Sequence, residues 1–159
     1  MLAGMGRLGC GLILAALVFA GGCSSFDRDF KAARAASQLH PAPSIGGAWE
    51  GRWRSENGHG SGKLRCLLTP LSEGAYQARF KATYLGFLKA TYNVTLRGAG
   101  QEGEAVLLAG EEDLGFFAGG KYQYRGRVTP TGFSCTYDSK HDRGTFTLMR
   151  PPPLEKAAE

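Results

Sequence analysis

The chain has 159 residues, 24 of them glycine, and a formal net charge of +5. Once a leader and a linker are set aside, this length leaves room for one domain, which can bury a core without metals or several disulfides. The small positive charge favours weak attraction to anionic surfaces but identifies no partner.

The N-terminal segment has the pattern of a secretory leader. Arg7 supplies a positive charge, and an apolar run over 12–20 follows it. This run is shorter than the roughly 20 apolar residues that span a bilayer, but it has the length of a signal-peptide core. Small residues then lead to Cys23, so we predict a cleaved signal peptide over residues 1–22.

The stretch Ala20-Gly21-Gly22-Cys23 resembles the lipobox of bacterial lipoproteins, although that family usually has leucine where this chain has Ala20. The resemblance implies that Cys23 becomes the acylated first residue and anchors the protein to a membrane. Ser24 resembles the residue that follows the cysteine in lipoproteins sent to the outer membrane. In a cell with two membranes we therefore expect the periplasmic face of the outer membrane. The alternative is an ordinary secretory leader that ends near a cysteine.

Residues 23–44 are predicted to tether the domain to the lipid. The part from Asp27 to Leu39 has few apolar positions, with aspartates first and basic residues later, and could form a short helix. The segment 40–43 contains two prolines and favours an extended spacer. Of the two interpretations we prefer a disordered linker, which would hold the domain away from the lipid surface.

From Ala48 onward, apolar and polar residues alternate with period two, as in strands that have one buried face. The clearest such strand runs from Tyr76 to Tyr84. The segment 105–109 is apolar throughout and is expected to be covered on both sides. Glycines over 98–103 predict a turn between a strand over 89–97 and this apolar segment.

About eight strand segments separated by turns lie between Ile45 and Pro151. Short connections favour antiparallel neighbours, and closure removes exposed strand edges. We therefore predict an all-β domain over 45–151, with about eight antiparallel strands in a meander forming a small barrel. A two-sheet β-sandwich is the alternative. Residues 152–159 are expected to form a disordered tail.

The opening segment 47–53 and the closing segment 142–148 are similar to those of the calycin group, the avidin- and lipocalin-type barrels. This resemblance implies a barrel and raises the hypothesis that the domain carries a small apolar ligand. It assigns no ligand site to numbered positions.

Large aromatic side chains fall on the predicted inner face of the barrel. If they line a pocket for an apolar ligand, the candidate lining residues are Trp49, Trp53, Tyr76, Phe80, Tyr92, Tyr122 and Tyr124. Side chains alone can fill an eight-stranded barrel. We therefore prefer a packed aromatic core with at most a shallow mouth.

Cys66 and Cys135 also fall on predicted inner faces, in different strands. Because a secreted domain meets an oxidising compartment, we expect them to form a structural disulfide. Two buried free thiols are the alternative.

Six basic residues lie on the polar faces of neighbouring predicted strands: Lys63, Arg65, Arg79, Lys81, Lys89 and Arg97. They could form a basic surface that faces anionic lipid, a glycan or another envelope protein. Nucleic acid is not an expected partner outside the cytoplasm. The alternative, which we prefer, is a solvated sheet face that discourages aggregation.

The sequence contains no recognisable motif for catalysis or for metal binding. The histidines lack metal-ligand spacing, and neither a GxSxG nor an HExxH motif occurs. Asp138, His141 and Asp142 share one loop, which we interpret as a polar hairpin turn rather than a cation site. No cofactor or metal is expected. The sequence thus predicts a membrane-anchored envelope lipoprotein with a non-enzymatic binding or interaction module. The alternatives are a carrier of a small apolar ligand and an envelope enzyme of unrecognised type.

Overall fold

A computed structural model describes residues 18–39, 44–72, 74–115 and 120–153. Most of the predicted leader and of the predicted C-terminal tail lies outside these residues. The described part contains one helix and eight strands, which are α1 (Val18–Leu39), β1 (Gly47–Ser55), β2 (Ser61–Pro70), β3 (Ala75–Tyr84), β4 (Leu88–Glu102), β5 (Ala105–Asp113), β6 (Lys121–Val128), β7 (Gly132–Ser139) and β8 (Arg143–Met149).

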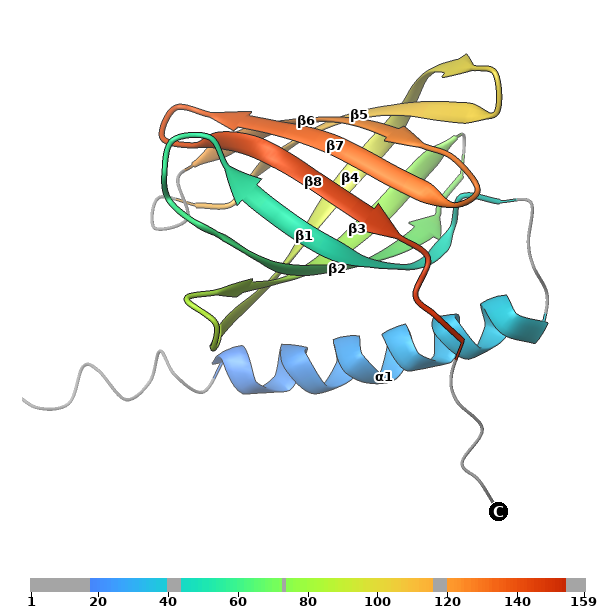
Figure 1. Ribbon diagram of the computed structural model, residues 1–159, viewed down its shortest axis with the longest axis horizontal. Coiled ribbons are helices and arrows are strands. Elements are labelled where there is room, and N and C mark those ends of the chain that lie inside the picture. The colour runs from blue at the N-terminus through green and yellow to red at the C-terminus, as the bar shows by residue number, and fades with distance from the viewer. Residues whose placement is uncertain (1–17, 40–43, 73, 116–119, 154–159) are drawn as a thin grey trace, which may run out of the picture.

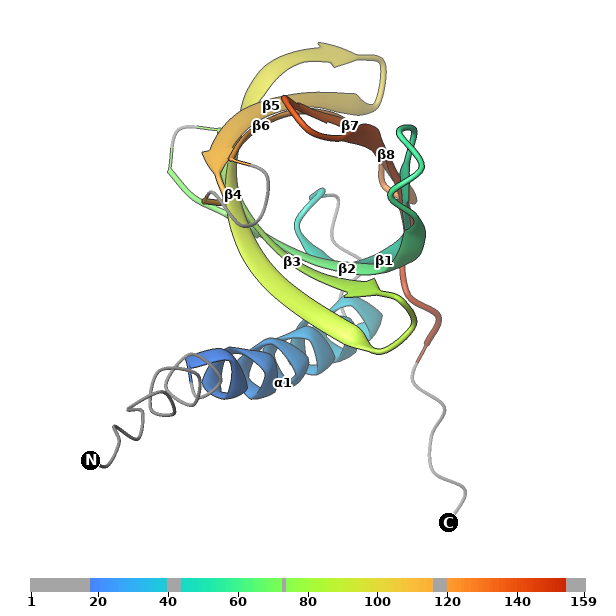
Figure 2. The ribbon, with the colours of Figure 1, turned by 90° about the vertical axis from the view of Figure 1, so that its left-hand side faces the viewer.

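The eight strands form a closed barrel in which each strand runs antiparallel to the next (Figures 1 and 2). The first and last strands close the ring, with Trp53 of β1 opposite Phe146 of β8. Closure leaves no strand edge exposed to pair with another chain. The predicted all-β meander barrel is therefore confirmed, and the two-sheet sandwich is excluded.

The period-two pattern places alternate side chains inside the barrel. In β3, Ala78, Phe80 and Ala82 are buried in the core, while Arg79 points outward between them. The expected cover on both sides of 105–109 is wrong: Val106 packs against the barrel core, but Leu107 and Ala109 on the outer face are only half-buried. That face of β5 has no second layer of structure over it among the described elements.

Strand β4 continues through the region where a turn was expected. It is 15 residues long, and its pairing with β5 shifts register between Gly98 and Gly100. A bulge absorbs an extra residue and bends the strand. Gly100 has a φ of 148°, a backbone conformation that residues with a side chain rarely adopt. This glycine therefore marks the bulge rather than the turn.

One end of the barrel is closed by Trp49 and Arg150. The Trp49 ring is fully buried, and the Arg150 guanidinium lies 3.8 Å from its centre. The same guanidinium donates hydrogen bonds to the carbonyls of Ser44 (3.0 Å) and Gly46 (2.7 Å). It therefore fixes the entering chain against the residue that leaves β8.

The expected disordered linker is wrong, since α1 forms a continuous helix packed on the outside of the barrel (Figure 1). Phe26 and Phe30, four residues apart, lie on one helix face and are buried against Ala48 and Leu67 of the first two strands. Burial of two phenylalanines contributes roughly 3–6 kcal/mol to the docking of the helix on the barrel.

Among the described residues, no helix combines the length and hydropathy that a membrane span requires.

Candidate functional site

The outer face of the sheet beneath α1 is basic, and the helix brings two carboxylates to it. Lys81 Nζ lies 2.6 Å from Asp27 Oδ2, and Arg65 lies 3.3 Å from the other oxygen of that carboxylate. Lys81 is only 7 % exposed, so its ammonium is held between the sheet and the helix. A lysine that is so far buried needs a partner for its charge.

A second ion pair lies farther along the helix. Asp29 Oδ2 accepts a hydrogen bond of 3.0 Å from Arg79, and this bond lowers the pKa of the Asp29 carboxyl. The Arg79 guanidinium also lies 5.6 Å from the centre of the Phe26 ring. Helix α1 thus covers Arg65, Arg79 and Lys81, which are three of the six residues predicted to form a basic surface.

The remaining basic residues separate into two places. Lys63 and Lys89 line an open groove of about 600 Å³ beside the helix, together with Arg52. Arg97 is exposed and lies outside this groove. The charged side chains that line the groove are Arg52, Lys63, Arg65, Lys81, Lys89 and Asp27.

This groove, which we call the basic groove, carries a net positive charge. Its one carboxylate, Asp27, is already engaged by Lys81 and Arg65. Among the described residues, no acidic side chain pairs with Arg52, Lys63 or Lys89. Three exposed cations around a hollow can therefore bind an anionic group.

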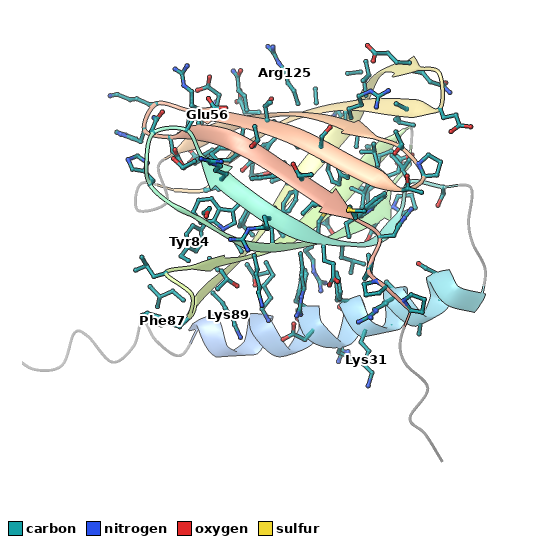
Figure 3. All side chains as sticks on the ribbon, in the orientation of Figure 1. Lys31, Glu56, Tyr84, Phe87, Lys89 and Arg125 are labelled. Carbon is teal, nitrogen blue, oxygen red and sulfur yellow. The ribbon has the colours of Figure 1, made fainter. Side chains whose placement is uncertain are left out.

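The tight turn between β3 and β4 forms one wall of the basic groove and exposes apolar side chains. Leu85 is 79 % exposed, Phe87 is 70 % and Leu88 is 51 %. The turn closes with a hydrogen bond from the Phe87 amide to the Tyr84 carbonyl, and Gly86 lines the groove. We call residues 84–88 the hairpin tip; Figure 3 shows Phe87 and Lys89 near the end of the molecule where α1 begins.

The barrel interior is occupied by aromatic rings in mutual contact. The Phe80 ring centre lies 5.3 Å from that of Tyr92, 6.5 Å from that of Tyr124 and 5.4 Å from that of Phe146. Tyr122 stacks on Tyr124 at 6.2 Å. Burial raises the pKa of the Tyr92 and Tyr124 hydroxyls, as a desolvated environment requires.

The predicted ligand-lining residues are therefore brought together, but largely as a packed core. Trp49, Phe80 and Tyr124 are buried, whereas Tyr76 and Tyr122 are half-buried at its edge. Trp53 is also buried, and its indole N–H donates to the Thr83 carbonyl across the barrel wall.

The expected disulfide is wrong, because Cys66 and Cys135 are both buried free thiols. Cys66 lies in β2 and Cys135 in β7, and the strands β1 and β8 separate them around the barrel. A disulfide requires Cα atoms about 4.4–6.8 Å apart, which suits direct neighbours in a sheet. Burial raises the pKa of the Cys135 thiol to about 12 and that of Cys66 well above its usual value.

A serine, a histidine and an aspartate meet between two hairpins, an arrangement that the sequence analysis missed. The Ser55 hydroxyl donates to Asp142 Oδ1 at 2.6 Å, and His59 Nδ1 lies 3.3 Å from the same oxygen. Tyr137 donates to the other oxygen of Asp142 at 3.1 Å. The distance in sequence between the hairpins hid this cluster.

The geometry of this cluster is structural rather than catalytic. In a Ser-His-Asp triad the histidine ring takes the serine proton, but here the Ser55 hydroxyl and His59 Nδ1 both contact the Asp142 carboxylate. The Ser55 oxygen also accepts the backbone N–H groups of Asn57 and His59, so it is already engaged. Asp142 thus ties the β1–β2 hairpin to the β7–β8 hairpin. Within the described part of the chain, no group of three or more His, Cys, Asp or Glu side chains is arranged to hold a metal ion.

Cys23, the residue predicted to be acylated, lies within α1, and its side chain falls outside the described ones. No family model matches the chain, and neither a curated protein nor a solved structure matches it. The geometry of the barrel surface and the N-terminal pattern are therefore the features that bear on function.

Proposed function

We propose that this protein is a lipid-anchored protein of the bacterial cell envelope whose barrel is a non-enzymatic interaction module. The basic groove, which the hairpin tip borders at Gly86, carries this proposal. An accessible hollow with a net positive charge suits the binding of an anionic partner. The interior of the barrel, in contrast, is occupied by aromatic side chains of the protein itself.

The position of α1 relates the groove to the expected anchor. Asp27 lines the groove, and Cys23 precedes it by four residues in the same helix. One helical turn corresponds to about 5.4 Å along the axis. An acyl group on Cys23 would therefore hold the basic groove close to the membrane, because α1 is packed on the barrel and is not a flexible linker.

The carrier hypothesis has weaker support. A carrier of an apolar ligand needs an internal cavity, and the contacts among Phe80, Tyr92, Tyr124 and Phe146 occupy the centre of this small barrel. Interaction through the outer surface requires no rearrangement of that core.

Incorporation of a clickable fatty acid tests the anchor. The full chain is expressed in a bacterium beside two single variants, Cys23→Ala and Cys10→Ala. We expect the wild type and Cys10→Ala to take up the label and to stay with membranes through a high-salt wash. Cys23→Ala should remain unlabelled. Equal labelling of Cys23→Ala, or an unlabelled wild type, would contradict the proposal.

A further inference from the structure

We infer that the hairpin tip is a second membrane contact: Leu85, Phe87 and Leu88 insert into the surface of the bilayer that carries the anchor, and the basic groove binds its anionic phospholipid headgroups. This inference rests on the proposed lipid anchor and adds the orientation of the barrel and the lipid class that it contacts.

The hairpin tip concentrates the exposed apolar surface of the described molecule. Its three most exposed side chains lie within four consecutive positions, and the partly exposed Tyr84 precedes them. The other exposed large apolar side chains, Leu71 and Met149, lie far from each other in sequence and outside this cluster. An exposed apolar cluster is an interaction site more often than an isolated apolar side chain is.

The backbone of Leu85 indicates that its side chain is not there for folding. Leu85 has a φ of 50°, and it is the one described residue other than glycine with a positive φ. Asn, Asp or Gly adopts this conformation at lower cost in a tight turn such as this one, in which residues 85–87 connect the paired Tyr84 and Leu88. Contacts within the folded protein do not explain a leucine that is both strained and exposed, and a contact of its side chain outside the protein would explain it.

The charges beside the tip match the layered structure of a membrane surface. Lys89 directly follows the tip in sequence, and Lys63 lines the same groove as Gly86 of the turn. Apolar side chains at the boundary between headgroups and acyl chains, flanked by lysines among anionic headgroups, are the arrangement found in interfacial membrane anchors.

The orientation is consistent with the anchor. The hairpin tip and the start of α1 both lie at the left end of the molecule in Figure 1, and both lie below the barrel in Figure 2, the tip to the right and the start of the helix to the left. Glu56 and Arg125 lie on the opposite side of the barrel from Phe87 and Lys89 (Figure 3). A bilayer that held Cys23 could thus receive the tip without any change in the fold.

The test uses the full-length, processed protein reconstituted into vesicles of phosphatidylcholine with phosphatidylglycerol. An environment-sensitive fluorophore is attached at Leu85→Cys, or at Thr131→Cys in the exposed turn between β6 and β7 as the matched control. The buried thiols Cys66 and Cys135 should not react. We expect a lipid-borne quencher to quench the tip label strongly and the control label weakly. Equal quenching of the two labels would overturn the inference.

Flotation of the same vesicles separates this inference from the proposed anchor. Protein that floats while its tip label stays in water retains the anchor and refutes the membrane-inserting tip. If mass measurement shows no acyl chains, the protein is offered to the vesicles from outside. If the unacylated protein then binds phosphatidylglycerol vesicles, and Phe87→Ser weakens this binding by about tenfold or more, the result supports the membrane-inserting tip but not the lipid anchor. No binding would refute both the tip and the anchor.

Two further variants separate contact from folding. Leu85→Asn relieves the positive φ, so we expect an unchanged or higher midpoint of thermal unfolding together with weaker quenching at a label placed on Phe87→Cys. Lys89→Glu should also weaken quenching in phosphatidylglycerol vesicles, whereas Arg97→Glu, the same charge change on β4 outside the groove, should not. Equal effects of these two charge reversals would refute the role of the basic groove.

Discussion

Lys81 of β3 and Asp27 of α1 form a close ion pair across the boundary between barrel and helix, with Nζ and Oδ2 2.6 Å apart. Lys81 is nearly buried, whereas Asp27 is 49 % exposed. The Lys81 ammonium also lies over the buried Phe26 ring, whose centre is 5.7 Å from Nζ. The helix therefore supplies the counter-charge that permits a lysine to sit under it.

We predict an asymmetric effect of breaking this pair. Asp27→Asn should lower the free energy of unfolding by about 1–3 kcal/mol, because it leaves the Lys81 charge buried without a carboxylate. Lys81→Met should cost less, because an apolar side chain of similar size packs on Phe26. Urea denaturation of both variants and of the double variant measures the coupling, which should be strongly non-additive.

Lys31→Ala is the control for this cycle. Lys31 lies on the same helix but points away from the barrel (Figure 3), so its removal should change stability by less than about 0.5 kcal/mol. If Asp27→Asn were as mild as Lys31→Ala, the ion pair would not hold the helix.

Docking of α1 should weaken in acid. The hydrogen bond from Arg79 lowers the pKa of Asp29 below its usual value of 3.8. A lowered pKa in the folded state means that the carboxylate contributes stability above pH 3.8 and loses this contribution as the pH falls further. The protection factors of the α1 amides, which correct for the intrinsic pH dependence of exchange, should therefore fall below about pH 4, more than those of the barrel strands. In Asp29→Asn this loss of protection should shrink.

The two buried thiols should resist alkylation in the folded protein. At pH 8 both are protonated, since burial raises the pKa of Cys135 to about 12 and that of Cys66 well above 9. Iodoacetamide should leave both unmodified in the native state and modify both in urea. An intact mass lower by two hydrogens, with no labelling in urea, would instead reveal a disulfide.

The same thiols predict loss of stability in alkali. Folding raises their pKa values, so their contribution to the free energy of unfolding is complete below about pH 9 and decreases as the pH rises toward 12. Replacement of Cys135 by alanine should flatten this part of the stability profile, measured by urea denaturation at successive pH values. A profile unchanged by Cys135→Ala would contradict the assignment.

Arg150→Ala should destabilise the closed end of the barrel by about 2–4 kcal/mol. It removes hydrogen bonds to the carbonyls of Ser44 and Gly46 and the contact with the Trp49 ring. Tryptophan fluorescence during urea denaturation reports the loss. Arg150→Lys should recover only part of it, because a single ammonium cannot reach all of these groups. Arg125→Ala, an exposed control, should have little effect.

The sequence predicts the barrel well because each strand carries its own period-two signal, as in the segment from Tyr76 to Tyr84. Contacts between segments that lie far apart in the chain could not be predicted from the sequence. Asp27 meets Lys81 54 positions later, and Cys66 and Cys135 look equivalent until the strand order shows that two strands separate them. The register that assembles Ser55, His59 and Asp142 likewise follows from barrel closure. The i, i+4 phenylalanines of α1, with aspartates beside them, were the local signal for a docked helix.

The central claim, a membrane anchor at Cys23, is tested most directly by mass spectrometry of the mature N-terminal peptide from bacterial membranes. The account predicts a peptide that begins at Cys23 and carries a diacylglyceryl thioether and an acylated amine. A mature chain that begins at any other residue, or an unmodified Cys23, would contradict it.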